Sequence, residues 1–268
     1  MQDADLKDRY ELAQAIAQEA GQLTLEYFNK PIEVQRKSDD SPVTIADQRA
    51  EQLLRKRIAD LFPDDGIIGE EYGVESGSSP YRWILDPIDG TKSFISGVPL
   101  FGTLVGLQYQ EQSQAGVIYM PGLDEGIHAV AGQGAWHWRG QDDPVRAQVD
   151  AELTLENGAF LFSQRDSFDE RGAGAAFLEL EKRAGITRTW GDCYGYLLVA
   201  TGRAALMIDP VMSIWDAAAL QPIMREAGGT FTDWAGQPRV DAGEGIGAHA
   251  GILEAILEVT RPYVGGQV

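Results

Sequence analysis

The chain has 268 residues, of which 44% are hydrophobic, enough to form one large core or two adjoining ones. Its 41 acidic and 22 basic residues give a net charge of −19, so it lacks the Lys and Arg surplus that nucleic acids and anionic membranes attract. A single cysteine excludes an intramolecular disulfide, and neither a basic secretory leader nor an apolar run of 18 residues occurs. We therefore expect a cytoplasmic protein with neither a nucleic-acid nor a membrane partner.

Two helices are predicted at the start of the chain. Apolar residues such as Ile16 recur at helical spacing throughout residues 5–29. A second helix is predicted over about 44–61, because residues such as Leu54 form an apolar face that stops before Pro63.

Strands are predicted next, near 66–69 and 82–86, where the residues are mostly apolar. From 99 to 138, short β-branched and aromatic runs broken by glycine indicate a meander of antiparallel strands. A charged loop follows near 139–151. We expect this loop to mark the boundary between two closely packed lobes of a single domain, 1–268.

The second half of the chain alternates strands and helices. Its clearest predicted helices are 169–184, 192–202 and 216–227, and the last is ended by Gly228 and Gly229. Helices and strands of both kinds, with one antiparallel portion, fit two stacked lobes that each contain a sheet and helices.

Acidic residues stand at the ends of three predicted elements. Asp86 and Asp89 belong to the segment Asp-Pro-Ile-Asp-Gly-Thr, where a strand turns; Glu70 follows another strand, and Asp216 begins a helix. Carboxylate oxygens are hard ligands that suit Mg²⁺, so the pattern indicates a site for several metal ions. Taken alone, Asp86 and Asp89 could instead cap a turn. Asp216 could be the N-cap of its helix and still present its other oxygen to a metal.

These segments resemble the inositol monophosphatase family of metal-dependent phosphatases. Glu70-Glu71, then Asp86 to Thr91, then Trp215-Asp216-Ala217-Ala218 follow the family order, and the resemblance covers roughly residues 5–260. It implies an α/β (α+β) fold, the five-layered αβαβα sandwich of the inositol monophosphatase and fructose-bisphosphatase type. It also implies a small-molecule phosphate ester as substrate and two or three Mg²⁺ ions per active site, with Mn²⁺ as a substitute. A homodimer is compatible with it.

The resemblance implies two sets of metal ligands that share Asp86. The first set is Glu70, Asp86 and the carbonyl oxygen of Ile88, and the second is Asp86, Asp89 and Asp216. Because adjacent residues of a strand point to opposite faces, we expect only one of Glu70 and Glu71 to face the metals, and the family position favours Glu70.

The segment from Thr44 to Asp47 fits a capping box that opens a helix. The resemblance instead aligns Asp47 with the carboxylate that pairs with the motif threonine, here Thr91. The implied catalytic residues are thus Asp47, Thr91 and Glu70, and the implied reaction is in-line attack of a metal-activated water on phosphorus. No covalent phosphoenzyme is expected, because no His motif accompanies a Ser or Cys nucleophile; Cys193 is interpreted as a small buried residue.

Two segments bear on the alcohol that the enzyme would release. Lys92-Ser93-Phe94 and Gly191-Asp192-Cys193-Tyr194 resemble the histidinol-phosphatase branch of the family, whereas Trp215 is typical of the inositol-type members. The residues expected to bind substrate are Gly90, Thr91, Gly191, Asp192, Cys193, Asp209 and Asp216.

Among these residues, Gly90 and Thr91 would hold phosphate oxygens through backbone N–H groups at the start of a short helix. Asp192 and Asp209 would place negative charge beside the leaving group and favour a cationic alcohol such as histidinol, unless Asp209 pairs with Arg203. Lys37 is either a positive charge near the entrance or a solvated surface lysine.

We therefore expect a Mg²⁺-dependent phosphomonoesterase that hydrolyses L-histidinol phosphate in histidine biosynthesis. Family members that act on inositol 1-phosphate or on 3′-phosphoadenosine 5′-phosphate are the main alternatives, and the second substrate would need more basic residues than these segments provide. A non-catalytic regulatory binding module is the third alternative. Such a module would be expected to have lost metal ligands, and here every one of them is present.

Overall fold

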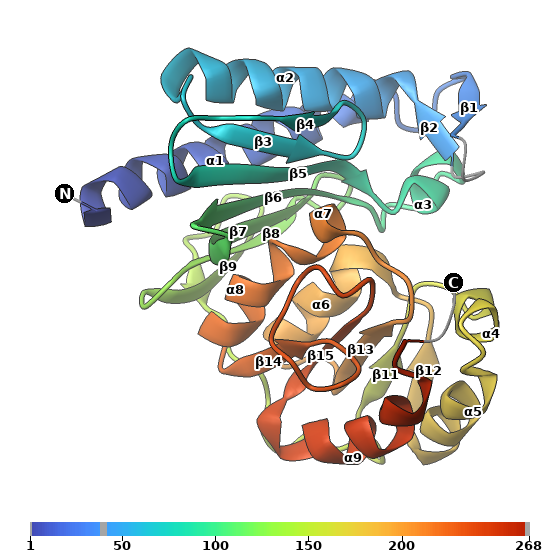
Figure 1. Cartoon of the computed structure of the whole chain (residues 1–268). Helices are drawn as coiled ribbons and strands as arrows, with labels where there is room; N and C mark the ends of the chain where they lie inside the picture. Colours follow the sequence, from blue (N-terminus) through green and yellow to red (C-terminus); the bar gives the residue numbers. More distant parts are fainter. Residues whose placement is uncertain (1, 38–41, 266–268) are drawn as a thin grey trace.

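Three layers of helices alternate with two β-sheets in the computed structural model, which describes residues 2–37 and 42–265 (Figure 1). The first layer is α1 (Gln2–Leu25) and α2 (Ile45–Leu61), which pack on the outer face of the first sheet. The middle layer is α6 (Asp192–Ala200), α7 (Ile214–Ala217) and α8 (Leu220–Glu226). The last layer is α4 (Asp166–Glu170), α5 (Gly174–Arg183) and α9 (Ala250–Thr260). The αβαβα sandwich is thereby confirmed.

The first sheet has eight strands in the order β10-β9-β8-β7-β6-β5-β3-β4, and every pair is antiparallel except β3 with β5. Its strands are β3 (Gly66–Gly69), β4 (Gly73–Glu75), β5 (Tyr81–Asp89), β6 (Gly102–Tyr109), β7 (Gln112–Met120), β8 (Glu125–Val130), β9 (Gly134–Arg139) and β10 (Val145–Arg146). The meander predicted over 99–138 is β6 to β9. Two short strands, β1 (Val34–Arg36) and β2 (Pro42–Thr44), pair separately.

The second sheet has five strands in the order β12-β11-β13-β15-β14. They are β11 (Ala159–Leu161), β12 (Ile186–Arg188), β13 (Leu206–Asp209), β14 (Gly229–Thr232) and β15 (Gly245–His249). The pairs of β11 with β12 and β13 are parallel, and the other two are antiparallel. Below, the N-terminal half is the chain through β10, and the C-terminal half is the chain from β11 onward.

Two glycines let the middle helical layer lie directly on the first sheet. A Cβ atom on Gly116 of β7 would stand 2.0 Å from the carbonyl oxygen of Ala219, and one on Gly106 of β6 would stand 3.0 Å from Ala218. The backbone between α7 and α8 can therefore approach the backbone of β6 and β7 closely. This close contact holds the C-terminal half against β6 and β7, and β6 pairs with β5, the strand that carries Asp86 and Asp89.

Two predicted helices are each divided in the structure. The helix expected over 169–184 is α4 and α5, with Gly172 at a φ of 75° between them, a conformation that ends a helix. The helix expected over 216–227 is α7 and α8, because Pro222 has no N–H to donate to the carbonyl group of Ala218. The strand β10 lies inside the expected loop 139–151.

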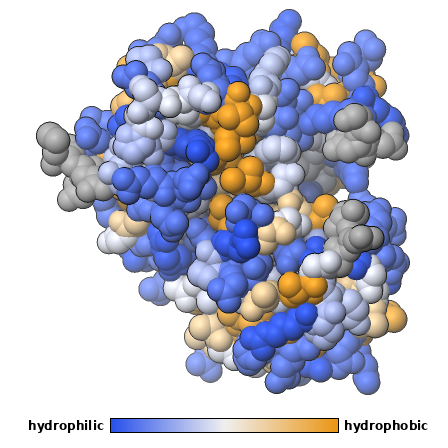
Figure 2. All heavy atoms as spheres, in the orientation of Figure 1, coloured by the Kyte–Doolittle hydropathy of each residue, from blue (hydrophilic) through white to orange (hydrophobic). Residues whose placement is uncertain are grey.

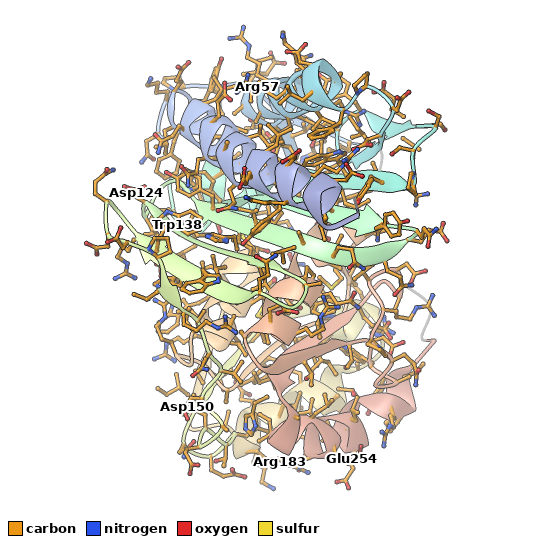
Figure 3. The ribbon with its side chains drawn as sticks, turned by 90° about the vertical axis from the view of Figure 1, so that its left-hand side faces the viewer. Arg57, Asp124, Trp138, Asp150, Arg183 and Glu254 are labelled. Atoms are coloured by element: carbon orange, nitrogen blue, oxygen red, sulfur yellow. The ribbon has the colours of Figure 1, made fainter. Side chains whose placement is uncertain are left out.

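The remaining corrections concern where elements end. The first helix ends at Leu25 rather than at residue 29, and β5 continues to Asp89 rather than ending at residue 86. Among residues 2–37 and 42–265, no helix is long and apolar enough to cross a membrane. The face seen in Figure 2 is mostly hydrophilic, as the net charge of −19 leads one to expect. In Figure 3, α1 runs across the first sheet, while Arg183 and Glu254 lie in the outermost helices at the opposite end.

Candidate active site

The first two candidate metal ligands lie on the last residues of β5. On the neighbouring strand β6, Asp86 pairs with Leu104 and Asp89 pairs with Gly102. The pairing register of β5 with β6 shifts between these two pairs. Such an irregularity re-aims side chains, which explains how residues three apart can serve one site. The backbone N–H of Ile88 donates to Oδ1 of Asp86 at 3.0 Å. Both carboxylates thus project from an irregular part of the strand β5 and not from the turn that follows it.

The third carboxylate comes from the C-terminal half. Asp216 is the third residue of α7, and its Oδ2 accepts a hydrogen bond of 2.6 Å from the N–H of Ser213, the N-cap. The N-cap alternative for Asp216 is therefore wrong, because Ser213 caps the helix and Asp216 completes the capping box. One carboxylate oxygen each from Asp86, Asp89 and Asp216 lies within 4.8 Å of the others.

This carboxylate cluster is electrostatically unfavourable by itself. Burial raises the pKa of Asp86 and of Asp89 well above the ordinary value, and neighbouring carboxylates raise both further. Burial likewise raises the pKa of Asp216 to about 7. A set of oxygen ligands that is at least partly buried and has such mutual repulsion is suited to hard divalent cations, which would offset the negative charge. Asp86, Asp89 and Asp216 therefore fit the second of the two ligand sets that the resemblance implies, and Glu70 is not in the group of carboxylates that come within 4.8 Å of one another.

Glu70 and Glu71 lie just after β3, in a turn rather than in the strand. The Nζ atom of Lys37 is 2.7 Å from Oε1 of Glu70 and 2.7 Å from Oε1 of Glu71. The expectation that the two carboxylates point to opposite faces is wrong, because strand alternation does not apply in the turn. Lys37 is not a solvated surface lysine, since its side chain is only 22% exposed and is paired with both carboxylates.

Asp47 makes the contacts that both interpretations require. Its Oδ2 accepts hydrogen bonds from the N–H of Thr44 at 2.8 Å and from the hydroxyl of Thr44 at 2.6 Å, which completes the capping box of α2. Its Oδ1 is 3.3 Å from Oγ1 of Thr91, which also lies 3.1 Å from the carbonyl oxygen of Ile88. Burial raises the pKa of Asp47 to about 6.

A cleft of about 860 Å³ opens in front of these residues, and Glu70, Gly90, Thr91, Lys92, Asp192 and Asp216 contribute to its walls. Gly90 has a φ of 89° and turns the chain from β5 into α3 (Thr91–Ile95). A Cβ atom there would stand 2.9 Å from Oδ2 of Asp192. Glycine thus allows Asp192, from the C-terminal half, to lie against the DPIDGT segment.

A smaller pocket of about 70 Å³ adjoins the carboxylate cluster and is lined by Asp89, Ser163, Asp192, Asp209 and Asp216, among others. Oδ1 of Asp209 accepts a hydrogen bond of 2.6 Å from the hydroxyl of Ser163, whose oxygen accepts one of 2.8 Å from the N–H of Asp192. Burial raises the pKa of Asp209 to about 7. The alternative pairing of Asp209 with Arg203 is wrong, because Arg203 contacts Glu125 at 2.7 Å.

The segment around residue 191 supports the site mainly through its backbone. A Cβ atom on Gly191 would stand 2.3 Å from the Cα atom of Ser163, so glycine permits this close packing. The N–H of Cys193 donates to the carboxylate of Asp89, and its thiol is buried, as predicted. Ser163 is not among the residues predicted from the sequence, because it follows a short strand and belongs to no recognisable motif. Only the topology, which places β11 beside β13, could have revealed it.

Comparison with known proteins points to one family. A sequence profile of the inositol monophosphatase family matches residues 5–263. A histidinol-phosphatase from Chlorobaculum parvum is 42% identical over 237 residues, covering 88% of this chain and 90% of that protein. One from Streptomyces coelicolor is 35% identical over 258 residues, covering 94% and 97%. An inositol monophosphatase structure from Zymomonas mobilis has a TM-score of 0.83 at 29% identity and covers 95% of this chain and 98% of its own.

The family match and the relatives extend over nearly the whole chain, and the fold, the carboxylate cluster and the cleft agree with them. The chain therefore belongs to the inositol monophosphatase family and is a phosphoric monoester hydrolase that uses metal ions to act on small-molecule phosphate esters.

Proposed function

We propose that the protein is a Mg²⁺-dependent phosphatase that converts L-histidinol phosphate to L-histidinol and phosphate. The observation that carries this proposal is the pair of carboxylates, Asp192 and Asp209, in the pocket beside the carboxylate cluster. An alcohol with an ammonium group and an imidazole ring would offset their charge, whereas a neutral inositol ring would not. The two relatives named histidinol-phosphatase support the same substrate.

The proposed metal ligands are Glu70, Asp86, Asp89, Asp216 and the carbonyl oxygen of Ile88. When bound, Mg²⁺ would supply positive charge to offset the negative charge that develops on the phosphoryl and leaving-group oxygens. Because Asp86 and Asp89 come from the N-terminal half and Asp216 from the C-terminal half, the ligand set depends on the contact of both halves. We propose that these halves are two lobes of one catalytic domain.

Thr91 and Asp47 are proposed to position the attacking water and accept its proton. The hydroxyl of Thr91 can donate to Asp47 or to the carbonyl of Ile88, so its oxygen remains able to accept a hydrogen bond from water in the cleft. Thr44 fixes the other oxygen of Asp47 through two hydrogen bonds. A proton that leaves the water can therefore pass to Asp47 through the Thr91 hydroxyl, with Glu70 on the same cleft wall.

The two ends of the substrate would meet different residues. The backbone N–H groups of Gly90 and Thr91, where β5 turns into α3, are proposed to bind phosphate oxygens. Ser163 fixes the position of Asp209, and the N–H of Asp192 is fixed by the same hydroxyl. The alcohol would therefore enter a pocket whose two carboxylates are already oriented, which lowers the entropic cost of binding it.

The test measures phosphate release from L-histidinol phosphate and from inositol 1-phosphate under identical conditions with saturating Mg²⁺. We expect a kcat/KM for L-histidinol phosphate at least about tenfold higher, the value of one charge-assisted hydrogen bond. Equal or reversed preference would remove the proposed substrate while leaving the phosphatase assignment in place. Release of phosphate from neither ester, nor from 3′-phosphoadenosine 5′-phosphate, would remove the substrate classes considered above.

A further inference from the structure

A buried carboxylate that is not a proposed metal ligand lies beside the turn that carries Glu70. Glu51 is the seventh residue of α2 and is 0% exposed. A glutamate is rarely buried to this extent unless its charge is paired, so its partners indicate its role. Glu51 follows Asp47 by four residues, which places both carboxylates on the same face of α2.

Both oxygens of Glu51 accept hydrogen bonds from the turn between β3 and β4, residues 70–72. Its Oε2 atom accepts from the N–H of Glu71 at 2.7 Å, and its Oε1 atom accepts from the N–H of Tyr72 at 3.1 Å. A third N–H, at Nε of Arg55, donates to Oε1 at 2.7 Å. Because all three partners are donors, the side chain must accept at both oxygens, which a carboxylate can do and an amide cannot.

The strands on either side of the turn are also in contact with α2. A Cβ atom on Gly69, the last residue of β3, would stand 2.1 Å from Oε1 of Glu51, so glycine leaves the space that this carboxylate occupies. Arg55 donates from Nη2 to the carbonyl oxygen of Gly73, the first residue of β4, at 2.5 Å. Glu51 and Arg55 thus hold the turn from the N–H of residue 71 to the carbonyl group of residue 73.

The backbone of Glu70 is also held by the strand that carries two candidate metal ligands. The N–H of Glu70 donates to the carbonyl oxygen of Leu85 at 3.2 Å, and Asp86 is the next residue of β5. The Glu70 side chain therefore leaves the backbone between two fixed points, one on β5 and one on α2.

We propose that Glu51 is a positioning residue that holds the carboxylate of Glu70 where a metal ion can bind it. This role rests on the proposed function of Glu70 as a metal ligand. Glu51 does not line the catalytic cleft, so it acts only through the turn. Because Asp47 contacts Thr91 from the same face of α2, one helix fixes the positions of Glu70 and Thr91 relative to each other.

Calorimetric titration of the metal-free full chain with Mg²⁺ compares the wild type with Glu51→Gln and Glu70→Gln. The amide of Glu51→Gln turns its NH₂ group toward a donor, so the turn must shift. We expect the same Mg²⁺-binding step to weaken about 10- to 100-fold in both variants, the usual effect of losing a partner that orients a metal ligand. Glu19→Gln removes an exposed carboxylate that is 3.0 Å from Arg57, and this matched control should bind Mg²⁺ normally (Figure 3).

The double variant of Glu51→Gln with Glu70→Gln separates positioning from a general effect on the fold. If Glu51 acts through Glu70, its replacement has little further effect once residue 70 is an amide. The losses in Mg²⁺ affinity and in kcat should therefore not add, whereas independent effects would add in full. The rate kcat is measured with the phosphate ester that the wild type hydrolyses fastest.

Glu70→Gln by itself tests the proposed function of Glu70. Wild-type Mg²⁺ affinity and kcat in this variant would remove that function, and the role of Glu51 with it. A weakened Glu70→Gln beside a normal Glu51→Gln, or full addition in the double variant, would overturn the role of Glu51 alone. If Glu51→Gln does not fold, the same comparisons are made with Arg55→Gln, which releases Oε1 of Glu51 by changing a side chain that is 14% exposed.

Discussion

The hydroxyl oxygen of Thr91 lies 3.3 Å from Oδ1 of Asp47, although the two residues are 44 positions apart in the sequence. The contact joins the start of α3 to the first turn of α2. The other oxygen of Asp47 closes the capping box with Thr44, so a single carboxylate stabilises a helix and contacts Thr91, which lines the catalytic cleft.

Asp47→Asn separates these two roles. The amide can still accept the hydrogen bond from the N–H of Thr44, but it cannot take up a proton, so we expect kcat to fall by about 10²–10⁴ while KM changes little. Steady-state kinetics and a melting curve check this. The matched control is Thr44→Val, which removes the capping hydroxyl; it should cost about 1 kcal/mol of stability and lower kcat much less than Asp47→Asn, because the N–H of residue 44 still holds Oδ2 of Asp47. Equal kcat losses in both variants would contradict a proton-accepting role for Asp47.

Asp86→Asn should have opposite effects on activity and on the stability of the metal-free protein. Because Asp86 is proposed to contact both ions, kcat should fall by at least about three orders of magnitude. Burial and neighbouring carboxylates raise its pKa, so its ionised form destabilises the metal-free fold, and the neutral amide should raise the melting temperature in chelator. Melting curves with and without Mg²⁺ test this, with the exposed Asp142→Asn as control. A variant that retains both its rate and its Mg²⁺ stabilisation would exclude Asp86 as a shared ligand.

The sequence predicted the carboxylate cluster better than it predicted the surroundings of the cluster. Asp86, Asp89 and Asp216 are recognisable because a metal site requires particular residue types, and these residues stand in short motifs that can be read from the sequence. Glu71 was harder to place, because the turn after β3 sends its side chain to Lys37 and strand alternation does not apply. Ser163 has no motif, since its role depends only on β11 lying beside β13.

The fold was predicted in a similar way. The amphipathic pattern located α1 and α2, and the glycine-interrupted apolar runs located the meander β6 to β9. The division of α7 from α8 depends on Pro222, which has no N–H to donate within a helix. The apolar periodicity of 216–227 predicted one continuous helix because it takes no account of that missing donor. Strand order in the second sheet depends on pairs far apart in sequence, which periodicity does not record.

Removal of metal should abolish activity reversibly. The cluster offers oxygen ligands alone, which suits Mg²⁺ and Mn²⁺ more than softer metals. We expect exhaustive chelation to stop phosphate release, and addition of Mg²⁺ to restore it. Mn²⁺ should restore part of it. Undiminished turnover by protein shown to be metal-free would contradict the proposed role of the cluster.

Glu125 should make the fold sensitive to acid. Burial alone would raise its pKa, but hydrogen bonds from His137, Arg139 and Arg203 outweigh burial and lower the pKa from 4.5 to about 2. Because the pKa is lower in the folded state, the stabilisation is fully present above about pH 4.5 and is lost as the pH falls toward about 2. Acid should therefore weaken the contact of Arg203, in the C-terminal half, with β8.

Glu125→Gln tests this pH dependence. We expect it to cost about 1–3 kcal/mol at neutral pH, less than a fully buried ion pair would, because both arginine side chains reach solvent. The difference in free energy of unfolding between wild type and variant should shrink as the pH falls below about 4.5 toward about 2. Glu254→Gln, which removes an exposed ion pair, is the control and should change stability little. A difference that stays constant with pH would show that Glu125 does not titrate in this way.

Substrate preference should depend on Asp209 more than on any metal ligand. Its carboxylate is held by Ser163 in the pocket that would receive the alcohol, and one charge-assisted hydrogen bond from a cationic alcohol gives about 10- to 150-fold preference over a neutral one. Asp209→Asn should therefore reduce kcat/KM for L-histidinol phosphate by that factor and leave inositol 1-phosphate nearly unaffected. Asp216→Asn should reduce both equally, because a metal ligand serves the phosphate common to both esters. If Asp209→Asn reduces both esters equally, Asp209 supports the site without choosing the substrate.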